Sequence, residues 1–119
     1  MGLCTANKGD VIYVMPGHAE TLAAADGIAA DVAGINIIGL GNGAYRPTIT
    51  MGAVAATVSL GAASVKLKNL LFLMTFDATI VIDVNSTDGV LEDLEIRHGS
   101  SKEFVTAIDI NGGAANACD

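Results

Sequence analysis

The chain has 119 residues and a mass of 12.0 kDa, enough for one domain and too little for two of ordinary size. Hydrophobic residues make up 51% and charged residues 16%, which excludes a disordered protein because this much apolar surface can repay chain ordering. The net charge of −7 argues against nucleic acid as a partner, since phosphates require clustered Lys and Arg.

The N-terminal segment, residues 1–10, lacks the basic stretch followed by an apolar core that marks a secretory signal. We therefore expect synthesis in the cytoplasm and an N-terminal arm or cap over these residues. The longest uncharged apolar run, residues 52–65, is too short and too rich in small side chains for a membrane span. The sequence predicts no membrane anchor.

Short runs rich in β-branched residues follow along the chain, separated by Gly, Asn, Asp and Ser. They lie at residues 11–14, 35–38, 48–50, 57–60, 65–67, 79–84, 90–91 and 107–110. This pattern indicates an all-β fold. The alanine-rich stretch from Ala19 to Ala25 is the one segment that could form one or two helical turns.

An internal repeat organises these runs. Three segments align without gaps, at residues 34–40, 64–70 and 88–94. Their aliphatic markers are spaced by 30 and 24 residues, at Ile37, Leu67 and Leu91. Periods of this size are typical of solenoids. One aligned column contains Gly39, Asn69 and Asp93, and we expect these three to be structural bends, because Gly, Asn and Asp most readily adopt the left-handed conformation.

A second column aligns residues 81–84 with residues 107–110, offset by 26. Period-two alternation then predicts which side chains face the interior of the fold: Ile80, Ile82, Val84, Ile108 and Ile110. The same alternation predicts outward positions for Val81, Asp83 and Asp109. Two columns in phase indicate a parallel β-helix, or β-solenoid, of about four coils in a single domain, 1–119.

An antiparallel β-sandwich is the rival architecture, because it also uses short strands. Pairs such as Asn42-Gly43 and Asp88-Gly89 would suit its tight hairpins. The repeat of 24 to 30 residues has no reason to exist in a sandwich, which favours the solenoid.

The segment Gly-Asp-Val-Ile-Tyr-Val-Met-Pro-Gly, at 9–17, resembles the opening coil of right-handed parallel β-helix proteins of the pectate-lyase-like superfamily. The resemblance continues through residues 32–43, 46–50 and 65–72, and so covers nearly the whole chain. Pro-Gly-His-Ala-Glu-Thr at 16–21, followed by Val-Ala-Gly at 32–34, is similar to β-helix proteins encoded by tailed phages and prophages. The resemblance implies a right-handed single-stranded β-helix, a virion component and a homotrimer.

Candidate sites are few. Tyr45 and Arg46 could offer a sugar a stacking face and a charge, and Asp83 with Asp109 could form a stacked acidic pair. These four are weak ligand-binding candidates, and the simpler interpretations are a packed corner and a solvated face. We expect no catalytic residue, since neither His18 nor His98 has a Ser or Cys nucleophile at motif spacing.

Cofactors and metals are not expected, because two distant Cys and two His cannot supply the ligands of a metal site. Cys4 and Cys118 lie at opposite ends of the chain, several strand spacings apart in a solenoid, so we expect free thiols. The unpaired strands at both ends of a solenoid favour self-association.

The sequence therefore predicts a non-catalytic structural module of a phage virion, either a capsid decoration or part of a spike or fibre. Its expected partners are further copies of itself and other virion proteins. The alternative is a carbohydrate-binding or polysaccharide-cleaving β-helix fragment, with a surface polysaccharide as partner and a cleft lined by Tyr45, Asp83 and Asp109. A fragment of a longer β-helix with no activity of its own is also open.

Overall fold

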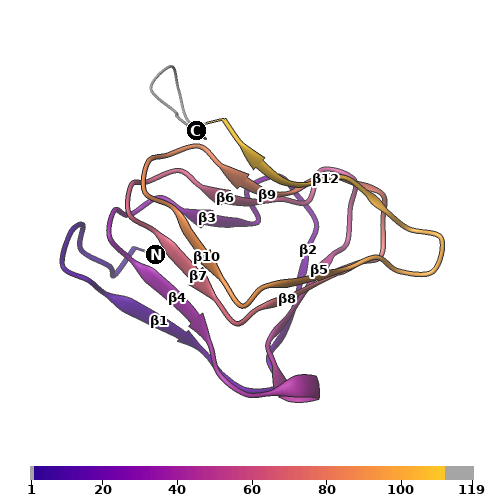
Figure 1. The fold of residues 1–119 in the computed structure, drawn as a ribbon, viewed down its shortest axis with the longest axis horizontal. Coiled ribbons are helices and arrows are strands. Elements are labelled where there is room, and N and C mark those ends of the chain that lie inside the picture. Colours follow the sequence, from indigo (N-terminus) through magenta and orange to yellow (C-terminus); the bar gives the residue numbers. More distant parts are fainter. Residues whose placement is uncertain (1, 112–119) are drawn as a thin grey trace.

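A computed structural model describes residues 2–111, in which three parallel sheets of four strands form the sides of a coiled chain (Figure 1). Sheet A contains β1 (Val11–Val14), β4 (Asn36–Gly39), β7 (Lys66–Lys68) and β10 (Val90–Glu92). Sheet B contains β2 (Ala19–Leu22), β5 (Thr48–Met51), β8 (Leu71–Met74) and β11 (Glu95–Arg97). Sheet C contains β3 (Ile28–Ala30), β6 (Val58–Leu60), β9 (Ala78–Val84) and β12 (Phe104–Ile110).

Each strand pairs in parallel with the strand three places later in the chain, so three consecutive strands make one coil and the chain forms a β-solenoid of about four coils. The short 3-10 helix η1 (Gly43–Tyr45) lies at the corner between β4 and β5. The predicted all-β fold is confirmed. The antiparallel sandwich is excluded, because all nine strand pairings are parallel.

The strand register matches both predicted columns. Ile37 pairs with Leu67, and Leu67 pairs with Leu91, at the predicted offsets of 30 and 24 residues. Asp83 pairs with Asp109 at the predicted offset of 26. The sequence repeat is therefore the stacking of one coil on the next.

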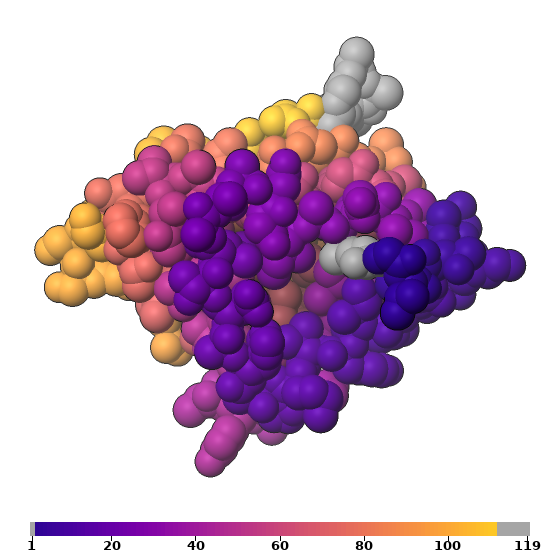
Figure 2. Space-filling model, turned by 180° about the vertical axis from the view of Figure 1, so that it is seen from behind, coloured from indigo at the N-terminus to yellow at the C-terminus, as the bar shows by residue number. Residues whose placement is uncertain are grey.

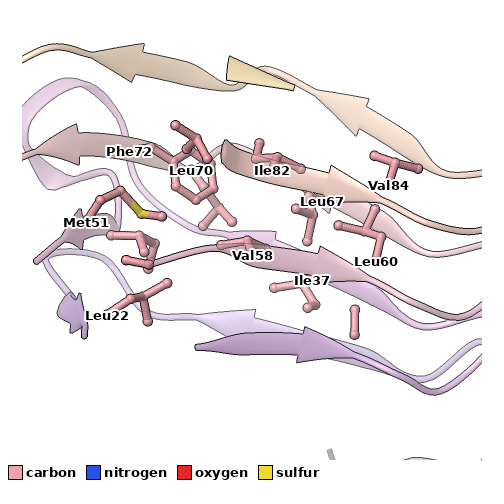
Figure 3. Close-up of a cluster of buried hydrophobic side chains, with 14 of the residues drawn as sticks. Leu22, Ile37, Met51, Val58, Leu60, Leu67, Leu70, Phe72, Ile82 and Val84 are labelled. Atoms are coloured by element: carbon pink, nitrogen blue, oxygen red, sulfur yellow. The ribbon is translucent and has the colours of Figure 1, made fainter. Parts of the chain in front are cut away.

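The core lies inside the coils and is built from aliphatic side chains with one buried aromatic, Phe72 (Figure 3). In sheet C the inward columns read Ile28, Val58, Ile82, Ile108 and Ala30, Leu60, Val84, Ile110. Among the described residues, no polar or charged residue is buried. Side chains of this size fill layers that are stacked at strand spacing, about 4.8 Å apart.

Two predicted orientations, both on β9, are wrong. Val81 was expected to face outward but is fully buried in the core, next to buried Ile82, while Ile80 is partly exposed. Two successive buried positions mean that the period-two alternation breaks within β9. Ile108 and Ile110 occupy interior columns, yet they are 41% and 44% exposed, because no coil is stacked on β12 within the described chain.

The predicted bends at Asn69 and Asp93 have left-handed backbones, with φ of 56° and 52°. The prediction for Gly39 is wrong: it ends β4 without a positive φ, and the left-handed residues at this corner are Gly41 and Gly43, with φ of 103° and 53°. Gly39 is required for space instead, because a Cβ there would lie 2.2 Å from the carbonyl oxygen of Asn69 on the next coil.

A second column of left-handed residues precedes sheet A and was missed from the sequence. It comprises Gly9, Gly34, Ser64 and Asp88, with φ between 57° and 77°. Gly34, Ser64 and Asp88 are the first residues of the three aligned repeat segments. Each coil therefore turns from sheet C into sheet A through one left-handed residue.

The N-terminal residues differ from expectation in one respect. Ala19–Leu22 forms β2 rather than a helical turn, since its pairing with β5 outweighs the helix preference of the alanine-rich stretch. Residues 2–10 contain no strand, as expected for an arm. The arm is attached to coil 2, because the Asn7 amide donates a hydrogen bond to the Ala33 carbonyl at 2.8 Å, and Cys4 packs partly against the core.

Candidate functional site

The four candidate ligand residues do not converge on one site. Tyr45 is exposed in η1 at the corner between sheets A and B, whereas Asp83 and Asp109 lie on β9 and β12 of sheet C. Figure 1 shows η1 and these two strands on opposite sides of the coil. The cleft predicted for the polysaccharide alternative is therefore not formed.

Asp83 and Asp109 are stacked neighbours on sheet C, and each accepts a hydrogen bond from an asparagine two residues later. Asn85 donates to Asp83 at 2.8 Å, and Asn111 donates to Asp109 at 3.1 Å. The second oxygen of Asp83, Oδ1, is buried without a hydrogen-bond partner. Two carboxylates fall short of the six or more oxygens of a calcium site, and residues 2–111 contain no group of three or more potential metal ligands.

Arg46 belongs to an ion-pair network on the outer face of sheet B. Its Nη2 lies 2.7 Å from Glu95 Oε2, and Arg97 binds the other oxygen of the same carboxylate. The hydrogen bond from Arg97 is the main cause that lowers the pKa of Glu95, with further contributions from the charges of Arg97 and Arg46. Arg46 therefore joins the corner between β4 and β5 to β11, two coils further along, and is not free for a ligand.

Sheet A carries a second network. Lys66 and Lys68 each place Nζ 3.1 Å from the carboxylate of Glu92 on the next coil. With the pair between Lys102 and Asp77 at 3.6 Å, five of the six Lys and Arg residues form ion pairs within residues 2–111. All of these five except Arg97 pair with an acid on a different coil.

The Glu92 network predicts a weak dependence of stability on pH. Hydrogen bonds from Lys66 and then Lys68 lower the pKa of Glu92 below its ordinary value of 4.5. A lowered pKa means that this contribution is present above the unfolded value and is lost as the pH falls through the folded value. We expect Glu92→Gln to lower the urea midpoint slightly at neutral pH, and the difference from wild type to shrink at low pH, below the ordinary value of 4.5.

The matched control is Glu103→Gln, which removes an exposed carboxylate that makes no ion pair within residues 2–111. The comparison needs urea unfolding of all three proteins at both pH values. A difference between Glu92→Gln and wild type that persists at low pH would contradict the assignment.

The outer face of the first coil is apolar. Val11, Tyr13 and Met15 alternate along β1 and the residue that follows it, with exposures of 40%, 59% and 63%. Ile38 on β4 is half-buried and pairs with Tyr13, so it extends the same surface. We call these four residues the sheet A strip. Large apolar side chains gathered on one face of a sheet are typical of a surface that contacts another molecule.

The two ends of the solenoid differ in polarity. At the C-terminal end, the inward residues Leu91, Ile96 and Phe104 are only partly covered, as are Ile108 and Ile110. At the N-terminal end, Glu20 occupies the sheet B column that contains Ile49, Phe72 and Ile96 in the later coils. Glu20 is exposed there and lies 3.3 Å from His18.

Figure 2 shows the N-terminal end from behind, covered by the first coil and the N-terminal residues in the darkest colours. An inward charge is one of the features with which natural sheets block further pairing at an edge. Within residues 2–111, the first coil of the solenoid therefore carries an inward charge and the last coil has an apolar interior. Glu20 interrupts an otherwise apolar column, which is a sign of this difference in the sequence itself. The column could not be recognised before the 29-residue offset from β2 to β5 was known.

Shallow depressions flank Phe104 at the C-terminal end, lined by side chains that include Asp77, His98 and Glu103. Lys102 already pairs with Asp77, and the Asp77 carboxylate accepts a hydrogen bond from the Glu103 amide at 3.2 Å. These contacts hold the loop between β11 and β12 against the loop between β8 and β9 of the preceding coil.

Comparison of the chain with protein-family models, with curated proteins and with solved structures gives no match. Its class is therefore defined by its own coordinates, as a parallel β-solenoid of about four coils. Within residues 2–111, no helix is long and apolar enough to cross a membrane. Cys4 is a half-buried thiol that makes no disulfide in this part of the chain, and Cys118 lies outside the described residues.

Proposed function

We propose that the protein is a non-catalytic structural module of a virion, of the kind encoded by tailed phages, which decorates a capsid or forms part of a spike or fibre. The observation that carries the proposal is the sheet A strip, a row of exposed apolar side chains on a flat parallel sheet. The phage origin rests on the resemblance of residues 16–21 and 32–34 to β-helix proteins of tailed phages and prophages.

Two further features support an architectural role. The core within the described chain is wholly apolar, and the basic side chains that could act on a substrate are engaged in ion pairs between coils. Parallel strands in register also give a stiff unit, because every coil is hydrogen-bonded to the next along three sheets. Such a unit transmits load and presents a regular outer surface.

The sheet A strip is the surface through which we propose that copies associate side by side, as a homotrimer. A flat apolar strip suits the packing of parallel solenoids around a common axis, and the stoichiometry comes from the resemblance to phage proteins. Lys66, Lys68 and Glu92 lie on the same face and would form the polar rim of the contact.

The test is the mass in solution of wild type and Tyr13→Glu, measured by light scattering with and without reductant. We expect a wild-type assembly built from trimers of the 12.0 kDa chain, insensitive to reductant. Tyr13→Glu should reduce the number of chains joined through the lateral contact from three to one, because it places a charge in the centre of the strip. The control is Val54→Glu, an exposed aliphatic position on the corner between β5 and β6, which should leave the mass unchanged. A Tyr13→Glu protein with wild-type mass would contradict the lateral contact.

A further inference from the structure

The last coil of the described chain, β10 to β12, is not covered by another coil. Within residues 2–111, β10, β11 and β12 each pair with a strand on one side only. The side chains that point into the coil at this end are almost all apolar, and Ile108 and Ile110 are about two-fifths exposed. Backbone groups that lack partners and an uncovered apolar interior favour the addition of another layer.

The first coil of a second chain is poorly suited to cover this end. Stacking the N-terminal end of a second chain on β10, β11 and β12 would continue the existing columns, and would place Glu20 against Ile96. The Glu20 carboxylate would then be buried in an apolar column, with the His18 imidazole at 3.3 Å as its one ion-pair partner within residues 2–111. Head-to-tail growth is therefore disfavoured, and the complementary surface must be another apolar end.

We propose that the C-terminal end docks on the C-terminal end of a second copy, around a two-fold axis. This inference rests on the proposed role in assembly and names the partner of one surface. The axis passes through the corner between β10 and β11, at Asp93 and Leu94, and through Ala107 at the middle of β12. Rotation about it makes β12 antiparallel to the partner's β12, and places β10 opposite the partner's β11.

The side chains suit this register. Along β12, Ala107 faces the partner's Ala107, the inward residue Phe104 faces the partner's Ile110, and Thr106 faces the partner's Ile108. The acid Asp109 faces the partner's Val105, so the two Asp109 carboxylates do not meet. Between β10 and β11, the inward Leu91 faces the partner's Ile96. The same axis thus closes both strand pairings with apolar side chains inside.

The charges on the outer faces do not oppose this contact strongly. Glu92 faces the partner's Glu95, but both carboxylates are already neutralised within their own chain. Glu92 is held by Lys66 and Lys68, and Glu95 by Arg46 and Arg97. No other pair of like charges is brought directly opposite along the matched strands.

The area is sufficient for a stable contact. The molecule measures 39 × 33 × 25 Å, and Figure 1 is viewed down the shortest dimension, into the coil. An end of these two longer dimensions has an area of about 1,000 Å², against about 800 Å² on each partner in a standard protein interface. Taken alone, a two-fold contact closes on itself, so the end-to-end contact gives a dimer rather than a fibre.

A cysteine placed on the axis tests the geometry. In a Cys4→Ser, Cys118→Ser background, Ala107→Cys should form a covalent dimer under mild oxidation, because paired residues in antiparallel strands lie about 5 Å apart at Cα, within disulfide range. The matched control is Val105→Cys, which faces Asp109 rather than itself and should remain uncrosslinked. Absence of the Ala107→Cys dimer, or equal crosslinking of Val105→Cys, would overturn the proposal.

Mass measurement separates this contact from the lateral one. Tyr13→Glu should lose the lateral contact and keep the Ala107→Cys crosslink, leaving an end-to-end dimer. In the Tyr13→Glu background, Ile108→Glu should then halve the mass from two chains to one, with circular dichroism to show that the strands remain. A wild-type mass of two chains would refute the proposed trimer alone, and an unchanged mass on adding Ile108→Glu to Tyr13→Glu would refute the end-to-end contact alone.

Discussion

Replacing Phe72 by alanine is expected to lower the free energy of unfolding by about 3–5 kcal/mol. Phe72 is fully buried on β8, and it stacks between Ile49 and Ile96 in the inward column of sheet B. The loss combines the transfer of the aromatic ring with the cavity left between two coils, which cannot collapse because their backbones are hydrogen-bonded at fixed spacing. A domain of this size has a total stability of about 5–15 kcal/mol, so the variant should be close to unfolding.

Urea unfolding followed by circular dichroism measures this effect, and Phe76→Ala is the matched control. Phe76 lies in the loop between β8 and β9 and is 48% exposed, so its loss should cost about 1 kcal/mol or less. Equal losses for the two variants would show that Phe72 does not lie inside a packed column.

The corner residue Asn69 is the second position where a large effect is expected. Its backbone is left-handed, and its side-chain Nδ2 donates hydrogen bonds to the carbonyls of Gly39 at 3.0 Å and Gly41 at 2.9 Å on the coil before it. Asn69→Ala should cost about 3–4 kcal/mol, from about 1–2 for the left-handed conformation and about 1 for each of the two hydrogen bonds.

Two glycine variants separate these contributions. Asn69→Gly removes the hydrogen bonds but tolerates the conformation, so it should cost about 1–2 kcal/mol. Asp93→Gly is the control, because Asp93 has nearly the same φ but makes no side-chain hydrogen bond within the described chain, and its stability should change little. A cost for Asp93→Gly equal to that for Asn69→Gly would contradict a bridging role for the asparagine.

The fold was predictable because residues that stack on one another in successive coils recur at a regular spacing in the sequence. The column of Ile37, Leu67 and Leu91 is a line of neighbours on one sheet, and any residue that broke it would disturb the layer above and the layer below. The bend at Gly39 was predicted wrongly because glycine has two uses. Here it permits close approach to Asn69 rather than a left-handed turn, and a sequence alone does not distinguish the two.

The ends of the solenoid were the least predictable part. Ile108 and Ile110 follow the inward pattern of buried strands, but their exposure depends on whether another coil covers them, which is not a local property. The ligand-binding candidates failed to converge for a similar reason, since Tyr45 and Asp83 are assigned to opposite sides of the coil only by the number of residues in each turn. Glu20 became informative only when its column was known.

The central claim is that this solenoid acts by assembling with copies of itself rather than by binding a small ligand in a cleft. Light scattering of the wild-type protein over a range of concentrations tests it most directly. We expect the wild-type protein to have a reductant-insensitive mass that is a multiple of 12.0 kDa and persists on dilution. A mass of 12.0 kDa at every concentration would contradict both the lateral and the end-to-end contact.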